Sequence, residues 1–277
     1  MNRPLPWLRP KALIGMVHLQ ALPGSPRSRL SIGEIACKAA GEARLLAEAG
    51  FDAVMIENMH DAPYVHGRQG PEIVAAMTAA GLAVRAELAR VGLGHVPLGV
   101  QVLSGGTREA VAVALACGGV FARIENFVFA HVADEGLLAE AEAGPLLRYR
   151  RSIGAEGISL LCDIKKKHAS HAITADVSLG EAAAAAEFFG ADAVVVTGSA
   201  TGRATSAEDL AAARAGTSLP VIVGSGATPE TVAALLETAD AIIVGSAIKH
   251  GGVWHADPDP ARVEAMVRAV HAARGEA

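Results

Sequence analysis

Three observations predict that residues 1–277 form a single (β/α)8 barrel, with residues 1–11 as an N-terminal extension. Eight apolar runs alternate with stretches of helix-forming residues along the chain. The runs are continuously apolar, which is typical of parallel strands buried on both faces. The last two runs each end in a glycine-rich turn, as expected for a phosphate site in such a barrel. A doubly wound open sheet is the alternative, but no GxGxxG motif follows the first run.

Strands and helices are expected to alternate from residue 12 to the end of the chain. The strands are predicted at 12–18, 53–58, 97–103, 120–125, 159–165, 193–198, 220–224 and 241–245. The helices are predicted at 31–49, 71–91, 107–117, 144–153, 178–189, 206–215, 228–238 and 259–273. Ser178 and Glu181 have the spacing of a capping box. Thr228 and Thr231 are expected at the cap of the seventh helix, with Pro229 at its first position.

Three of the strands begin with the same short pattern, a small residue followed by Asp-Ala and a β-branched run. The copies lie at 50–56, 190–196 and 238–244. In the first two copies a glycine can end the preceding helix in the left-handed conformation. Each copy is therefore predicted to be a turn that leads from a helix into a buried strand.

Composition and charge narrow the class of protein. The formal net charge of −5 and pI of about 6.1 give no basic surface for nucleic acid. Three cysteines without a CxxC pair indicate a reducing compartment. We find no signal peptide and no apolar stretch long enough to cross a bilayer. These features predict a cytoplasmic protein, with peripheral attachment to a membrane left open, and the Ala-rich helices favour a homo-oligomer.

Polar residues follow nearly every predicted strand, at the end of the barrel where catalytic groups lie in this fold. Any one of them could be structural or solvated, but a cluster of buried charges normally marks a site. The residues expected to carry chemistry are Glu57, Arg123, Glu125, Asp163 and Lys165. The residues expected to bind substrate include His18, Asn58, Gln101, Thr197 and Gly198.

The roles of the charged residues follow from their chemistry. Glu57 and Glu125 could act as general base and general acid, and Arg123 could hold an anion. Lys165 could form a Schiff base or stabilise an enediolate, and it should share a strand face with Asp163. No dedicated metal motif is present and no metal ligand is assigned. His18, His60, Glu57 and Asp163 could nevertheless bind a divalent metal.

The two glycine turns are the predicted phosphate site. The first contains Gly224, Ser225 and Gly226, and the second contains Gly245 and Ser246. Glycine lets backbone N–H groups approach an anion closely, and a short helix expected near 248–250 would add its N-terminus. Small residues that merely make tight turns are the alternative for either turn alone.

A long loop at 126–144 contains Phe127, Phe129 and His131. We consider three alternatives for this loop: a lid over a ligand, a patch that covers a neighbouring subunit, and a local small core. His168 and His171 are expected in the loop after the fifth strand, without a helical pattern around them.

The sequence resembles the BtpA family, which includes SgcQ-type proteins, over nearly its whole length. The matching segments are IGMVHLQALPGSP at 14–26, GFDAVMIEN at 50–58, GVQVL at 99–103, FARIEN at 121–126, DIKKKH at 163–168, VTGSATG at 196–202 and both glycine turns. The resemblance implies a barrel of the ribulose-phosphate-binding type. It also implies a link either to photosystem I biogenesis or to carbohydrate utilisation.

Two classes of function remain open at this stage. The first is an enzyme that acts on a small phosphorylated, sugar-derived substrate by isomerase, epimerase, aldolase or lyase chemistry. The second is a non-enzymatic factor for the biogenesis or stability of a membrane complex such as photosystem I. A phosphate site adjoining converging acidic and basic groups favours the enzyme, and an occluded barrel mouth beside a large apolar patch favours the factor.

Overall fold

Eight parallel strands close into a barrel in the computed structural model, which describes residues 5–166, 168–198 and 205–276. The strand order is β1-β2-β3-β4-β7-β9-β10-β11, and β11 pairs again with β1. The bounds are Ala12–His18 (β1), Ala53–Glu57 (β2), Leu98–Gln101 (β3), Phe121–Ile124 (β4), Ser159–Ile164 (β7), Ala193–Val196 (β9), Val221–Val223 (β10) and Ala241–Val244 (β11). The predicted (β/α)8 barrel is confirmed.

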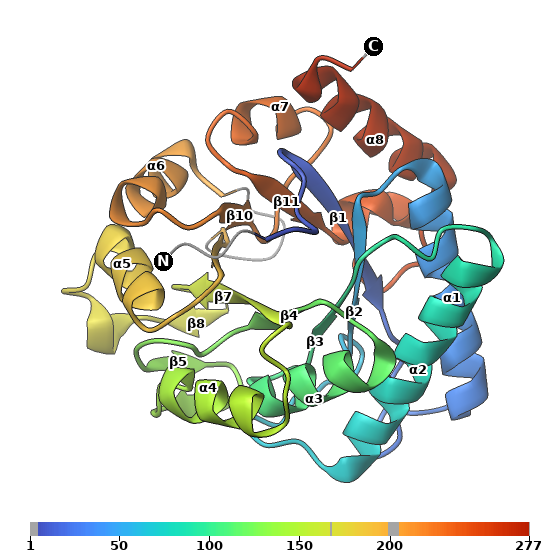
Figure 1. The fold of residues 1–277 in the computed structure, drawn as a ribbon, viewed down its shortest axis with the longest axis horizontal. Helices are drawn as coiled ribbons and strands as arrows, with labels where there is room; N and C mark the ends of the chain where they lie inside the picture. The colour runs from blue at the N-terminus through green and yellow to red at the C-terminus, as the bar shows by residue number, and fades with distance from the viewer. Residues whose placement is uncertain (1–4, 167, 199–204, 277) are drawn as a thin grey trace.

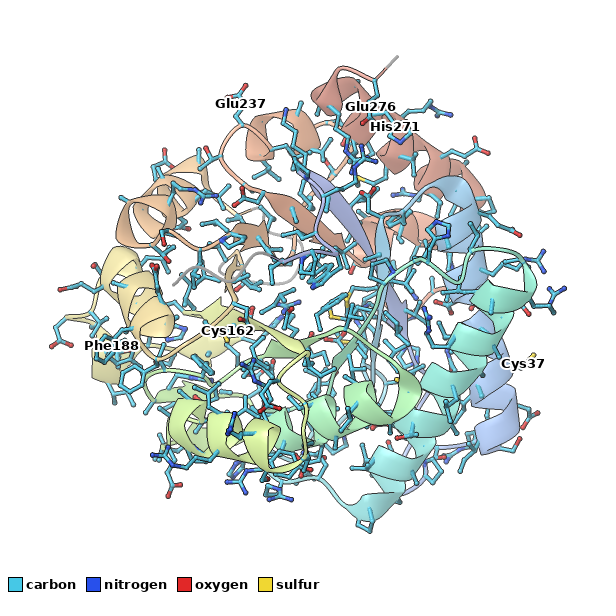
Figure 2. All side chains as sticks on the ribbon, viewed as in Figure 1. Cys37, Cys162, Phe188, Glu237, His271 and Glu276 are labelled. Carbon is cyan, nitrogen blue, oxygen red and sulfur yellow. The ribbon has the colours of Figure 1, made fainter. Side chains whose placement is uncertain are left out.

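Helices surround the barrel in a ring (Figure 1). They are Ile32–Ala49 (α1), Pro71–Arg90 (α2), Thr107–Cys117 (α3), Ala143–Ser152 (α4), Leu179–Phe188 (α5), Ala207–Gly216 (α6), Val232–Leu235 (α7) and Pro260–Arg274 (α8). Side chains fill the space between this ring and the strands, so that Cys162 is buried whereas Cys37 is exposed (Figure 2). No helix among the described residues is long and apolar enough to span a bilayer.

The capping prediction is confirmed at α5, whereas at α7 Thr231 is the N-cap residue but Thr228 and Pro229 precede the helix. Ser178 and Glu181 make the expected capping box before Leu179. α7 begins only at Val232, so Pro229 is not its first residue. The Thr231 hydroxyl accepts the Thr228 N–H at 2.9 Å and makes a turn where the helix was expected. The proline therefore lies in that turn.

The three Asp-Ala strand starts share one interaction. The carboxylates of Asp52, Asp192 and Asp240 accept the backbone N–H of a residue at the start of the neighbouring strand, at 2.7–2.8 Å. Each carboxylate also pairs with an arginine, namely Arg274, Arg150 and Arg214 respectively. The aspartates thus tie adjacent strands and helices together at the N-terminal end of the barrel.

The barrel interior is apolar and its N-terminal end is closed by the extension. Residues from seven strands form this core, which consists of Ala12, Ile14, Met16, Ala53, Met55, Phe121, Leu161, Ala193, Val195, Ile222, Ala241 and Ile243. The Trp7 ring stacks on Phe121 with 4.3 Å between centroids, and its Nε1 donates to Ser159 Oγ. Gly99 leaves room for the Phe121 ring, because a Cβ there would lie 2.0 Å from it.

The long loop at 126–144 forms a β-hairpin above the barrel. Its strands are His131–Ala133 (β5) and Gly136–Leu138 (β6), and Ala169–Ser170 (β8) pairs with β5 from the β7–α5 connection. Phe127 is fully buried and Phe129 is 38% exposed. The connection continues through a 3-10 helix, Ala172–Thr174 (η1), so His168 and His171 lie outside any α-helix.

Candidate functional site

Polar residues and glycines form the layer above the apolar core, at the C-terminal end of the strands. Inward-facing residues recur every second position, so each strand contributes one residue just beyond the core. These residues are His18, Glu57, Gln101, Arg123, Asp163, Thr197, Gly224 and Gly245. The six with side chains are all buried. The structure therefore brings most of the predicted site residues to one end of the barrel.

An ion pair between Arg123 and Asp163 lies at the centre of this layer. Arg123 Nη2 is 3.0 Å from Asp163 Oδ1, and Arg123 Nε lies 3.2 Å from both carboxylate oxygens. Burial raises the pKa of Asp163 above its ordinary value, and the Arg123 guanidinium offsets only part of this effect. Arg123 Nη1 also donates to the Gly224 carbonyl at 3.4 Å. The guanidinium thus lies directly against the first glycine turn.

His18 lies between Glu57 and the second glycine turn. Its Nε2 is 3.5 Å from Glu57 Oε2, and its Nδ1 is 3.0 Å from the Trp254 carbonyl oxygen. A Cβ at Gly245 would lie 3.1 Å from His18 Nε2, so glycine permits the imidazole to contact this turn. The pairing of β1 with β2 sets His18 opposite Glu57 in the ladder.

Glu125 forms an ion pair with Lys166, the residue that follows the predicted site residue Lys165. Lys166 Nζ lies 3.3 Å from Glu125 Oε1 and 3.6 Å from Glu135 Oε1. Burial raises the pKa of Glu125, but Lys166 and the Gly105 N–H outweigh burial and leave the pKa below its ordinary value. Burial lowers the pKa of Lys166, and the two carboxylates reverse that effect and leave it raised. Lys166 is therefore an ammonium group.

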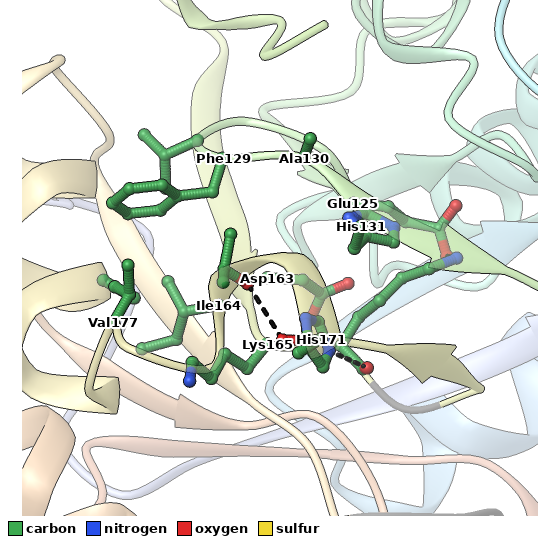
Figure 3. A pocket seen from close by; sticks show the side chains of 13 residues that line it. Glu125, Phe129, Ala130, His131, Asp163, Ile164, Lys165, His171 and Val177 are labelled. Atoms are coloured by element: carbon green, nitrogen blue, oxygen red, sulfur yellow. Dashed lines mark hydrogen bonds and ion pairs between the residues drawn. The ribbon is translucent and has the colours of Figure 1, made fainter. Parts of the chain in front are cut away.

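β7 ends one residue before Lys165, so the strand period does not extend to this residue, although Lys165, Asp163 and Glu125 line one cavity. Ile164 is the last strand residue, and Lys165 has a φ of 49°. The side chain of Lys165 lines a cavity above β7, and it extends away from Glu125 in Figure 3. The left-handed backbone turns the following residue, Lys166, toward Glu125. The alternation of residues along a strand does not predict that Lys166, rather than Lys165, turns toward Glu125.

That cavity has an apolar side and a polar side (Figure 3). Phe129, Ile164 and Val177 lie on the apolar side, and Glu125, His131 and His171 lie on the polar side. Burial, together with the nearby Lys166 charge, lowers the pKa of His131 to about 4, so this imidazole is neutral near pH 7. Its buried Nε2 has no hydrogen-bond partner among the described residues.

The first glycine turn contains hydrogen-bond donors that have no partner among the described residues. Within the described parts of the chain, Ser225 Oγ is buried without a partner, and no backbone hydrogen bond is donated by Ser225, Gly226 or Ala227. Gly226 has a φ of 79°, which favours glycine. After β11 come two 3-10 helices, Ser246–Ile248 (η2) and His250–Gly252 (η3), where one short helix near 248–250 was expected.

Of the other predicted binding residues, Asn58 is held by hydrogen bonds within the protein, and Gln101 has a buried oxygen without a described partner. The Asn58 side chain donates to Asp61 and to the Leu103 carbonyl, and it accepts the Leu103 N–H at 2.7 Å, so it braces two loops. Gln101 Oε1 is buried without a partner among the described residues. Thr197 and Gly198 are buried at the end of β9. Residues 199–202 and Lys167 of the family motifs lie outside the described residues.

Two further groups lie near the site: Tyr64, to which the sequence assigned no role, and His60, which it considered only as a possible metal ligand. Tyr64 has a raised pKa because it is partly buried and lies near the carboxylates of Glu57 and Glu125. His60 Nε2 is buried without a described partner, and burial together with Lys249 lowers the pKa of this histidine to about 4. Both residues lie in the β2–α2 loop, whose path the sequence does not specify. No group of three metal-ligating side chains occurs in the described part of the chain.

Comparison with solved structures places this molecule among the TIM-barrel proteins. A thiamine phosphate pyrophosphorylase from Pyrococcus furiosus has a TM-score of 0.58 at 16% identity, over 96% of this chain and 98% of that chain. A (S)-3-O-geranylgeranylglyceryl phosphate synthase from Thermoplasma acidophilum, solved with sn-glycerol-1-phosphate, has a TM-score of 0.59 at 16% identity, over 94% and 93% of the two chains. At these identities the likeness establishes the fold alone.

The sequence comparisons establish the family. The BtpA family profile matches residues 9–272. An uncharacterized mitochondrial protein of Caenorhabditis elegans is 42% identical, over 94% of this chain and 92% of its own length. The photosystem I biogenesis protein BtpA of Synechocystis is 34% identical, over 93% of this chain and 87% of its own length. This chain belongs to the BtpA family.

Proposed function

We propose that this protein is an enzyme that binds a small phosphorylated, sugar-derived substrate and transforms it by acid–base proton transfer. The main support for this proposal is the contact of Arg123 with the Gly224 turn, next to Asp163. A buried guanidinium beside backbone N–H groups that have no partner among the described residues provides charge and geometry suited to a phosphate. One of the structural neighbours was solved with sn-glycerol-1-phosphate, which supports the choice of ligand class.

The state of the lysines favours proton transfer over Schiff-base chemistry. A Schiff-base lysine must lose its proton to attack a carbonyl carbon. Lys166 is held as an ammonium between Glu125 and Glu135, and Lys165 extends away from Glu125. Isomerase or epimerase chemistry is therefore preferred to aldolase chemistry of the Schiff-base type. In this scheme Glu57 and His18 exchange protons with the substrate, and Lys166 with Glu125 provides fixed charge.

The first test is ligand binding, measured by thermal shift and calorimetry. The probes are inorganic phosphate, sn-glycerol 1-phosphate and a panel of pentose and hexose phosphates, each with and without Mg²⁺. A ligand at a hundred times its Kd should stabilise the fold by about 2.7 kcal/mol. Arg123→Gln should abolish this shift, whereas Arg151→Gln, whose side chain is 82% exposed, is the matched control.

Turnover is then tested by following exchange of substrate C–H hydrogens with D2O by NMR, using whichever sugar phosphate binds. Exchange supports the proposal. If no phosphorylated probe binds the intact protein, the proposal is wrong. In that case the name of the Synechocystis relative favours the alternative, a factor for the biogenesis of a membrane complex.

A further inference from the structure

His18 has a fixed protonation pattern that follows from its neighbours. Its Nδ1 lies 3.0 Å from the carbonyl oxygen of Trp254. A carbonyl oxygen only accepts hydrogen bonds, so Nδ1 must carry a proton for this contact to be a hydrogen bond. The Nε2 atom is then the only ring nitrogen whose protonation can change.

The Nε2 atom faces both an acid–base partner and the second glycine turn. It lies 3.5 Å from Glu57 Oε2, and both side chains are buried. A Cβ at Gly245 would come within 3.1 Å of the same nitrogen. The atom is therefore placed between the Glu57 carboxylate and the backbone that we assign to phosphate.

The Trp254 carbonyl is held in place by a closed loop. Lys249 and Pro258 form an isolated bridge at the base of the loop, and the His250 N–H donates to the Asp257 carbonyl at 3.0 Å. The Trp254 ring packs against the His60 ring with 5.0 Å between centroids. Trp254 thus lies in a loop closed at its base and packed against His60, with its carbonyl oxygen at hydrogen-bond distance from His18.

We infer that His18 is a proton-carrying catalytic residue and that Trp254 is its positioning residue. The Nδ1–H bond to Trp254 stays intact throughout. One mobile proton belongs to the pair of His18 and Glu57, either on Nε2 with Glu57 ionised or on Glu57 with Nε2 bare. From Nε2 this proton passes to a substrate oxygen beside Gly245, the N–H bond breaks as the O–H bond forms, and His18 is left neutral. The inference rests on the proposed function for the substrate, but the tautomer of His18 does not.

The test is long-range ¹H–¹⁵N NMR on the ligand-free protein labelled with ¹⁵N-histidine, with the His18 signals assigned from His18→Gln. We expect Nδ1 of His18 to be protonated at every pH at which the protein is folded. Trp254→Ala should release the ring and give a mixture of tautomers, and Trp254→Phe should restore the wild-type signals. A thermal melt of each variant verifies folding.

A neutral His18 with its proton on Nε2 would overturn the inference, and so would an unchanged spectrum in Trp254→Ala. If Trp254→Ala fails to fold, His60→Ala removes the ring that packs against Trp254 and provides the same test. Because no ligand is present, these outcomes are independent of whether a sugar phosphate binds. Failure of the ligand screen alone would contradict the proposed function and leave the tautomer result standing.

Discussion

The Arg123 guanidinium and the Asp163 carboxylate form a buried ion pair between neighbouring strands β4 and β7, with Nη2 and Oδ1 3.0 Å apart. The same guanidinium donates to the Gly224 carbonyl after β10. One side chain therefore connects three strands of the barrel and orients the first glycine turn. Removing either charge should affect stability and ligand binding together.

We expect Asp163→Asn to destabilise the protein by about 3 kcal/mol, because it leaves the Arg123 charge buried without its main counter-ion. The Glu57 and Glu125 carboxylates remain nearby and keep the loss at the lower end of the usual range. Urea unfolding of Asp163→Asn measures this loss, and urea unfolding of Arg123→Met, Asp163→Leu and the double variant Arg123→Met/Asp163→Leu measures the coupling of the two side chains. The double variant should cost less than the sum of its two single variants.

Asp192→Asn is the matched control, since Asp192 pairs with Arg150 at 3.0 Å at the opposite end of the barrel. It should lower stability without changing the affinity for inorganic phosphate or sn-glycerol 1-phosphate. If the losses of unfolding free energy in the Arg123 and Asp163 single variants add up to the loss in the double variant, the two side chains are not energetically coupled.

The alternation of residues within strands accounts for how much of the site the sequence predicts. His18, Glu57, Arg123 and Asp163 face inward because they share the parity of the apolar core, and that parity is readable from the chain. This parity argument holds only for residues within a strand and does not apply beyond its last residue. Lys165 has the correct parity, but its left-handed backbone gives the contact with Glu125 to Lys166.

Loop conformations were beyond prediction because they depend on contacts between distant segments. The hairpin of β5 and β6 is completed by β8 from another connection, about 30 residues further along the chain, so no local pattern specifies it. The short α7 has the same origin, since the Thr228–Thr231 turn competes with the first turn of a helix. The position of Trp254 against His18 also depends on a long-range contact.

Trp7 should contribute substantially to stability although it precedes the first strand. Its ring stacks on Phe121 and its Nε1 donates to Ser159 at 3.1 Å. We expect Trp7→Ala to lower the free energy of unfolding by about 2–3 kcal/mol, less than for a fully buried tryptophan. Trp7→Phe keeps the stacking and should cost only about 1 kcal/mol. Urea denaturation of both variants at pH 7 tests this, and equal costs would contradict the role of the stack.

Acid sensitivity should depend on His131. Its folded pKa of about 4 lies below the unfolded value of about 6.5, so the unfolded chain binds the extra proton between these values. The stabilising effect of the neutral ring is complete above pH 6.5 and decreases as the pH falls toward 4. This contribution should be lost in His131→Phe, whose stability should fall less steeply than that of wild type between pH 6.5 and 4.5. The free energy of unfolding is measured by urea denaturation at several pH values. If it depends on pH in the same way in wild type and His131→Phe, His131 does not cause the acid sensitivity.

Gly226→Val should weaken phosphate binding by closing the first glycine turn. The φ of 79° at Gly226 is unfavourable for valine, so we also expect a loss of about 1–3 kcal/mol in stability from backbone strain. Valine also removes the freedom of glycine, which lets backbone N–H groups of a turn approach an anion closely. Calorimetric titration with sn-glycerol 1-phosphate and with glycerol should show a loss of affinity for the phosphorylated form alone.

The strain needs its own control because it can lower affinity indirectly. Gly118 has a φ of 72° at the C-terminal end of α3, and among the described residues no atom outside its own helix and chain neighbours lies within 4 Å of a Cβ built there. Gly118→Val should therefore carry a similar backbone penalty at the other end of the barrel and leave phosphate affinity unchanged. If both variants lose affinity equally, strain explains the loss. If neither does, the Gly224–Gly226 turn does not bind the phosphate, and Arg123 must hold the anion without it.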